Sequence, residues 1–154
     1  MGASRRVSLW QRFGDREKIG LDTSVLVYYF NRHERYFKTC QRLVREIEFG
    51  RLRGVISVAS EMEVLVHPLA EKRAQVVNDI QQLFRRLRWL DIVPVDRTLA
   101  RQAAALRAET KLRSLDAIIA TTALAAGCRY LVGNDREFAS RIKGLGYIML
   151  GDYV

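Results

Sequence analysis

The chain has few of the residues that build disulfide-linked or zinc-bound proteins. Its 154 residues include only two cysteines, Cys40 and Cys128, and two histidines, His33 and His67. Two cysteines are too few for a disulfide framework, and neither histidine has the spacing of a zinc ligand. A disulfide-rich secreted domain and a zinc site are therefore disfavoured, and a cytoplasmic location is expected.

Long apolar runs and flexible linkers are also scarce. The longest uncharged run, Ala117 to Cys128, is too short to span a bilayer, and no apolar stretch follows the first arginines. Only two prolines and ten glycines are present, without repeats or low-complexity tracts. A chain of this length can bury about two-thirds of its unfolded surface, so we expect one domain over residues 18–154 and no membrane segment.

Positive charge is in excess. The formal net charge is +9, which favours a polyanionic partner such as RNA, because lysine and arginine contacts to phosphate release counterions. Residues 1–18 carry +3 of this charge, which leaves +6 on the rest. Residues 1–17 include Trp10 and Phe13 but show no clear period. We interpret them as a basic N-terminal extension that either packs on the body or is mobile.

Short apolar runs alternate with longer helical patterns, which is typical of an α/β fold with a parallel sheet covered by helices. The predicted strands are Lys18–Leu21, Gly54–Ser57, Leu90–Val95, Arg129–Val132 and Tyr147–Leu150. The predicted helices are Ser24–Phe30, Tyr36–Phe49, Val58–Val66, Glu71–Arg88, Arg97–Glu109, Ser114–Ala126 and Glu137–Lys143.

Two aspartates follow predicted strands. Asp22 is the only charged residue between Ile19 and Phe30, and Asp135 follows a strand and the turn residues Gly133 and Asn134. The carboxyl ends of parallel strands form the crevice in which ligands bind, so both side chains are candidates for a site there. Both residues are also good helix caps, and a cap alone would explain each of them.

A third aspartate, Asp116, is the only charge in a predicted helix that is apolar or small on every side. Such a helix is buried, and a buried carboxylate needs a positive partner. Ser114 is the expected cap, which places Asp116 in the first turn, where the helix dipole also favours an acid. Ala120 and Ala123 lie on the same face and leave room for another backbone or a metal ion.

The helix after the second strand offers two candidate acids, Glu61 and Glu63. We expect its apolar stripe to contain Val58, Ala59, Met62, Leu65 and Val66. The two glutamates flank this stripe on opposite sides, so periodicity does not choose between them, and either is compatible with a solvated surface position.

Carboxylates gathered in one crevice would repel one another unless a cation neutralised them. Hard oxygen ligands without cysteine or histidine indicate Mg²⁺ or Mn²⁺, which activates water and stabilises negative charge on phosphate. A basic protein with such a site is interpreted as a phosphodiesterase.

Four segments resemble the motifs of PIN-domain ribonucleases, and most closely those of VapC-type toxins. They are Leu-Asp-Thr-Ser-Val-Leu at 21–26, Ile-Ser-Val-Ala-Ser-Glu-Met-Glu at 56–63, Leu-Asp-Ala-Ile-Ile-Ala at 115–120 and Tyr-Leu-Val-Gly-Asn-Asp-Arg-Glu-Phe at 130–138. In the second motif a serine or threonine precedes the acid by three residues, and this spacing selects Glu63, with Ser60 before it. The departure is Gly133, where family members often carry a hydroxyl residue.

The resemblance implies a three-layer sandwich and an endoribonuclease that holds Mg²⁺ or Mn²⁺ with four acids. These metal-binding and catalytic residues would be Asp22, Glu63, Asp116 and Asp135. Supporting or RNA-binding residues would be Thr23, Ser24, Ser60, Asn134, Lys111 and Arg113, although the last two also fit a solvated loop. A homodimer and an antitoxin partner are implied as well. The apolar pattern of the early helices, with Tyr28, Tyr29, Tyr36 and Phe37, supports the dimer.

Other functions remain open or are disfavoured. A PIN-domain RNA-processing nuclease that is not a toxin, or a weakly active RNA-binding regulator, would share the four motifs. A haloacid-dehalogenase phosphatase needs a second aspartate two residues after the first, where this chain has Ser24. A receiver domain needs paired acids before its first-helix aspartate and a late lysine before proline, and neither is present.

Overall fold

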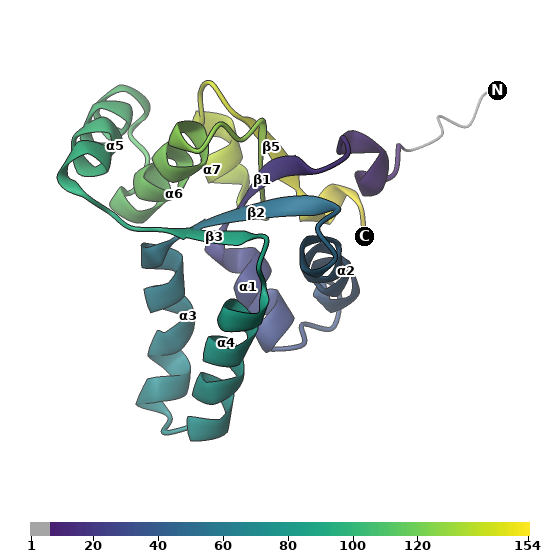
Figure 1. Ribbon diagram of the computed structural model, residues 1–154. Coiled ribbons are helices and arrows are strands. Elements are labelled where there is room, and N and C mark those ends of the chain that lie inside the picture. Colours follow the sequence, from purple (N-terminus) through teal and green to yellow (C-terminus); the bar gives the residue numbers. More distant parts are fainter. Residues whose placement is uncertain (1–6) are drawn as a thin grey trace.

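The computed structural model describes residues 7–154 as one parallel sheet between two layers of helices (Figure 1). The strands are β1 (Glu17–Leu21), β2 (Leu52–Ser57), β3 (Leu90–Val93), β4 (Tyr130–Gly133) and β5 (Gly146–Met149). Their order across the sheet is β3-β2-β1-β4-β5, and every neighbouring pair is parallel. The predicted three-layer α/β fold is confirmed.

Helices from the two halves of the chain cover opposite faces of the sheet (Figure 1). One face carries α1 (Thr23–Phe30), α2 (Phe37–Glu48), α3 (Val58–Ala70) and α4 (Ala74–Arg86). The other carries α5 (Arg97–Thr110), α6 (Ser114–Ala125) and α7 (Arg136–Arg141), and short 3-10 helices span Leu9–Arg12 and Leu150–Asp152. All predicted strands and helices are present. The largest boundary error lies between α3, which continues through Pro68, and α4, which begins three residues later than expected.

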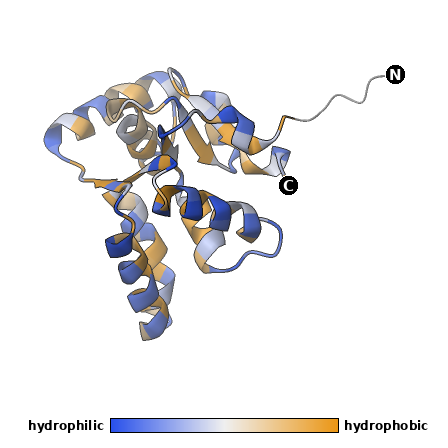
Figure 2. Cartoon of the chain, turned by 45° about the vertical axis from the view of Figure 1, so that its right-hand side comes forward, coloured by the Kyte–Doolittle hydropathy of each residue, from blue (hydrophilic) through white to orange (hydrophobic). Residues whose placement is uncertain are grey.

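The core consists of two apolar clusters, one on each side of the sheet. Hydrophobic residues are concentrated in the strands and on the helix sides that face them (Figure 2). Helix α6 is buried as predicted, and it lies very close to the central strand β1. A Cβ atom on Gly20 would stand 2.8 Å from the Cβ of Ala123, so glycine and alanine at these positions allow the close approach.

The predicted apolar stripe of α3 is not its buried face. The buried residues are Ser60, Val64 and Pro68, whereas Met62 is 55% exposed and Val66 is 49% exposed. Val58 and Leu69 are exposed as well. The expectation was wrong because α3 has apolar residues on more than one side, and periodicity does not tell which side meets the sheet. The result is an exposed apolar row, which is typical of an interaction surface.

The part of the N-terminal extension that the structure describes packs on the body. Leu9 is buried in the core, and Trp10 and Phe13 are packed against it. Residues 1–6 of the proposed extension lie outside the described residues. Cys40 and Cys128 are both buried with free thiols, and within residues 7–154 no helix is long and apolar enough to cross a membrane.

Candidate active site

Two of the predicted acids lie at the carboxyl ends of neighbouring strands. β1 ends at Leu21, directly before Asp22, and β4 ends at Gly133, two residues before Asp135. β1 and β4 pair with each other, and the chain order of the strands reverses between them. Ligands in open α/β sheets bind at such a reversal, outside the carboxyl ends of the strands.

Asp22 is a buried carboxylate with a donor on each oxygen. Its Oδ1 accepts a hydrogen bond from the backbone N–H of Thr23 at 2.7 Å, and its Oδ2 accepts one from the Tyr147 hydroxyl at 3.4 Å. The side chain caps α1, and the residue is only 7% exposed. Burial raises the pKa of Asp22 to about 6, with smaller contributions from the nearby carboxylates of Asp116 and Asp135, although the hydrogen bonds from Thr23 and Tyr147 lower it.

Asp135 also divides its two oxygens between two tasks. Oδ1 accepts a hydrogen bond from the backbone N–H of Phe138 at 3.0 Å and thereby caps α7. Oδ2 accepts a hydrogen bond from the Arg113 guanidinium, also at 3.0 Å. For both Asp22 and Asp135, the helix cap and the proposed site are therefore compatible, because they use different oxygens.

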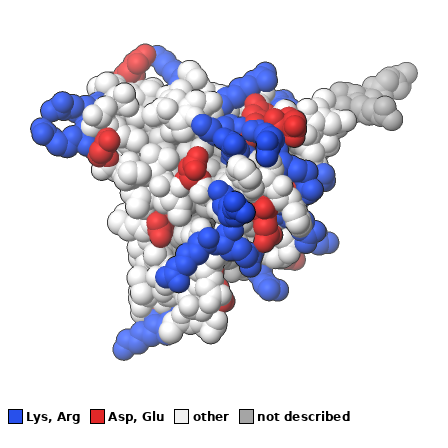
Figure 3. All heavy atoms as spheres, in the orientation of Figure 1, with Lys and Arg blue, Asp and Glu red and all other residues white. Residues whose placement is uncertain are grey.

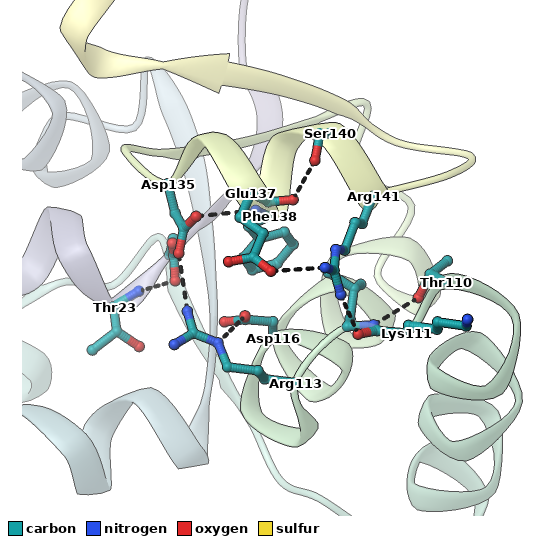
Figure 4. Close-up of polar contacts among 12 residues, drawn as sticks. Thr23, Thr110, Lys111, Arg113, Asp116, Asp135, Glu137, Phe138, Ser140 and Arg141 are labelled. Atoms are coloured by element: carbon teal, nitrogen blue, oxygen red, sulfur yellow. Dashed lines mark hydrogen bonds and ion pairs between the residues drawn. The ribbon is translucent and has the colours of Figure 1, made fainter.

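Asp116 enters the site from α6 and shares Arg113 with Asp135. Its Oδ2 lies 3.2 Å from Nε of Arg113, whose guanidinium bridges the two carboxylates (Figure 4). Burial raises the pKa of Asp116 although Arg113 lowers it. The expectation that Ser114 caps α6 is wrong, because the helix begins at Ser114 and the cap position is Arg113. Asp116 remains in the first turn, as predicted.

Glu63 is not brought into this group of contacts. It is exposed on α3, and within residues 7–154 no hydrogen bond or ion pair links it to the three aspartates. Its neighbour one turn earlier, Ser60, is fully buried and accepts a hydrogen bond from the Thr23 hydroxyl at 2.9 Å. This bond holds α3 against the start of α1, next to Asp22. The role of Glu63 stays a prediction, as does its selection over Glu61.

The other predicted supporting residues differ in their contacts. The Ser24 hydroxyl is buried without a hydrogen-bond partner among the described residues. The Asn134 side chain donates to the Tyr28 hydroxyl and accepts from the backbone of Gly151, so it ties α1 to the C-terminal segment. Lys111 is exposed, and its backbone carbonyl accepts a hydrogen bond from Arg141 at 2.8 Å.

Tyr147 is a site residue that our sequence reasoning missed. Its hydroxyl donates to Asp22 and also accepts a hydrogen bond from the backbone N–H of Asp135 at 3.1 Å. The sequence offered only an aromatic residue in the last predicted strand. The one signal was Gly133, whose lack of a hydroxyl left a position near the acids to be filled from elsewhere.

The donor set fits a hard divalent cation in chemistry but is not a preformed cage. Within residues 7–154, no three acidic, histidine or cysteine side chains are close enough together to hold a metal ion as they stand. Arg113 already places one positive charge between Asp116 and Asp135. The carboxylates of Asp22 and Asp116, whose pKa values burial raises, and the Ser24 hydroxyl, unpartnered among the described residues, match the oxygen ligands that Mg²⁺ and Mn²⁺ prefer.

A comparison with protein-family models places strands β2 to β4, most of β1 and the four predicted acids within one family, whereas β5 and Tyr147 lie beyond the matched residues. The PIN domain model matches residues 19–143, which include all four predicted acids. The chain belongs to the PIN-domain family. The match begins inside β1, so the N-terminal residues through Lys18 lie outside the matched PIN domain. No curated protein sequence matches the chain.

Solved structures of toxin–antitoxin proteins share the fold of this PIN domain. VapBC2 from Rickettsia felis, bound to a promoter DNA fragment, is 22% identical with a TM-score of 0.65, over 86% of this chain and 98% of that one. A toxin–antitoxin complex from Klebsiella pneumoniae is 26% identical with a TM-score of 0.62, over 86% and 97%. VapC20 from Mycobacterium tuberculosis, a toxin that cleaves the sarcin-ricin loop, is 16% identical with a TM-score of 0.64, over 79% and 93%.

Proposed function

We propose that this PIN domain is a metal-dependent endoribonuclease. The observation that carries the proposal is the convergence of Asp22, Asp116 and Asp135 from three separate elements, where burial and mutual repulsion raise the pKa of Asp22 to about 6. Such perturbed carboxylates mark functional sites. The net charge of +9 supports a polyanionic substrate, and the structural likeness to a toxin that cleaves the sarcin-ricin loop agrees with RNA.

Each residue has a proposed task. Asp22, Asp116 and Asp135, with Glu63 from α3, would hold Mg²⁺ or Mn²⁺, which when bound supplies an activated water and stabilises charge on phosphate. Thr23 and Ser60 fix the start of α1 against α3. Arg113 would turn from the carboxylates to a phosphate of the RNA, because its planar guanidinium suits both partners. Lys111 would add positive charge nearby.

We propose further that the protein is the toxin of a toxin–antitoxin pair. Two of the similar structures are toxin–antitoxin complexes by name. A groove between α1, α2 and α4, in which apolar residues such as Phe30 and Phe37 lie beside charged residues such as Arg32 and Arg86, is the candidate surface for an antitoxin segment. A PIN-domain RNA-processing nuclease or a weakly active RNA-binding regulator is the alternative. Expression of the wild-type chain should arrest growth only if it is a toxin.

A homodimer is also proposed, and the structure offers a second candidate surface for it beside the early aromatic residues. The early aromatic residues are half-buried and stack in pairs, Tyr28 on Tyr36 and Tyr29 on Phe37. The exposed apolar row on α3, with Met62 and Leu69, is the better candidate. Light scattering of the purified chain should give twice the monomer mass.

The deciding experiment measures cleavage of a labelled single-stranded RNA with Mn²⁺ or Mg²⁺, and with EDTA. Asp116→Asn should lower the rate by orders of magnitude while the fold survives, because it removes one ligand charge and keeps the shape. Asp91→Asn is the matched control, since Asp91 is exposed on β3 and far along the sheet from β4. Cleavage that ignores EDTA, or an Asp116→Asn variant as active as the control, would refute the proposal.

A further inference from the structure

One hydroxyl links the two strand ends that carry the acids. The Tyr147 side chain comes from β5, the edge strand next to β4, and its oxygen lies between the Oδ2 of Asp22 and the backbone N–H of Asp135. The hydroxyl therefore contacts both residues at once, although they belong to different strand ends. The Tyr147 ring packs against the buried ring of Phe138, with 5.4 Å between the centroids, and this contact holds the hydroxyl in place.

The space for this hydroxyl exists because residue 133 has no side chain. A Cβ atom built on Gly133 would overlap the Tyr147 hydroxyl oxygen and would stand 2.9 Å from both the Cβ and the Oδ2 of Asp22. Gly133 is not one of the glycines with positive φ, so its backbone conformation suits any residue. Glycine is needed here for room alone. A side chain at residue 133 and the hydroxyl of Tyr147 exclude each other.

We infer that Tyr147 is the positioning residue that orients the Asp22 carboxylate for metal binding. Gly133, which has no side chain, leaves the space that the Tyr147 hydroxyl occupies. The terminal torsion of an aspartate is soft, so the plane of its carboxylate is set by hydrogen bonds. Thr23 fixes Oδ1 and Tyr147 fixes Oδ2, so both oxygens of the buried Asp22 have a defined direction. Partners that orient a ligand in this way typically contribute ten- to a hundred-fold in metal affinity.

The first test uses Tyr147→Phe, which keeps the ring against Phe138 and removes only the oxygen. Calorimetric titration with Mn²⁺ should show about ten- to a hundred-fold weaker binding than for the wild type. Tyr130→Phe is the matched control, because Tyr130 stands at the other end of β4, next to Phe13. Equal affinity of Tyr147→Phe and the control would overturn the inference.

The second test needs no metal. In EDTA, Gly133→Ala should lower the melting temperature in the wild-type background and lower it less in the Tyr147→Phe background, where the overlapping oxygen is gone. Such non-additivity is expected of side chains in contact. Additive effects would overturn the shared-space argument. The role of Tyr147 in metal binding rests on the proposed function. A wild-type protein that binds no Mn²⁺ would refute that function. The melting temperatures in EDTA would still decide whether Tyr147 and Gly133 share one space.

Discussion

The two ends of the sheet differ in the charged side chains that gather there, acids at one end and arginines at the other, and in how exposed those side chains are. At the carboxyl ends of β1 and β4 lie Asp22, Asp116 and Asp135. At the amino ends, arginines lie over aromatic rings. Figure 3 shows many lysines and arginines, with some acids among them, on the right-hand side of the molecule. Measured from the arginine Cζ atom to the ring centroid, Arg16 lies 5.4 Å and Arg53 5.2 Å from Trp89. In the same measure, Arg12 lies 5.7 Å and Arg129 5.0 Å from Tyr130.

This difference indicates at which end of the sheet the charged groups lower the stability of the fold. The arginines of the amino end are exposed, so water and the ring faces attenuate the repulsion between two guanidiniums over one ring. Asp22 at the carboxyl end is buried, and its neighbours share one arginine between two carboxylates. Unfavourable local electrostatics that persist in a folded protein are typical of a functional site.

The largest expected effect is a pH dependence of stability that comes from Asp22. Its pKa is raised from 3.8 to about 6 on folding. Below pH 4 both states hold the proton and Asp22 contributes no penalty. Between pH 4 and 6 only the folded state holds it, so the free energy of unfolding falls as the pH rises, by about 3 kcal/mol in all.

Denaturant unfolding in EDTA at pH 4.5 and pH 7.5 measures this effect as the difference between wild type and Asp22→Asn. The variant should be the more stable protein at pH 7.5, and its advantage should shrink at pH 4.5. If the free energy of unfolding changed equally with pH in both proteins, the charge of Asp22 would not destabilise the fold, and the two ends of the sheet would not differ in this respect.

A smaller effect is expected at Arg113, which occupies the place of a cation between Asp116 and Asp135. Arg113→Gln should bind Mn²⁺ several-fold more tightly, because a competing charge is gone, and should bind uncleaved RNA more weakly. Arg101→Gln, an exposed arginine of α5, is the matched control. If both variants bound Mn²⁺ like the wild type, Arg113 would be a surface arginine of no consequence for the acids.

The smallest effect is expected at the amino end. Arg53→Gln and Arg129→Gln should each change the melting temperature by a few degrees at most, because an exposed cation–π contact is weak and its loss also relieves repulsion. Calorimetric titration should give an unchanged Mn²⁺ affinity. A large fall in either quantity would show that the two ends are coupled through the sheet.

Much of the fold could be predicted because its sequence signals are local. Each buried strand is a short apolar run, and the strongly amphipathic or wholly apolar helices have clear periods, so all twelve predicted elements are present. The three aspartates could be found because each is an acid in an apolar or strand-end context. Their convergence then follows from the sheet order, which places β1 beside β4.

The features that were missed depend on contacts between distant segments. Tyr147 is 125 residues from Asp22, and only the pairing of β4 with β5 brings its hydroxyl to the acid. The buried face of α3 is set partly by the bond from Thr23 to Ser60, which no period reveals. Periodicity also could not choose Glu63 over Glu61, and the choice made on family resemblance stays a prediction.

The two carboxylate oxygens of Asp22 and of Asp135 have separate roles, and this has a practical consequence for the choice of substitutions at these residues. One oxygen of each begins a helix, and the other faces the site. Asparagine keeps an oxygen that can accept the helix bond, whereas alanine would silence the site and fray α1 or α7 together. Asparagine is therefore better suited than alanine to a variant that changes the site and leaves both helix starts intact.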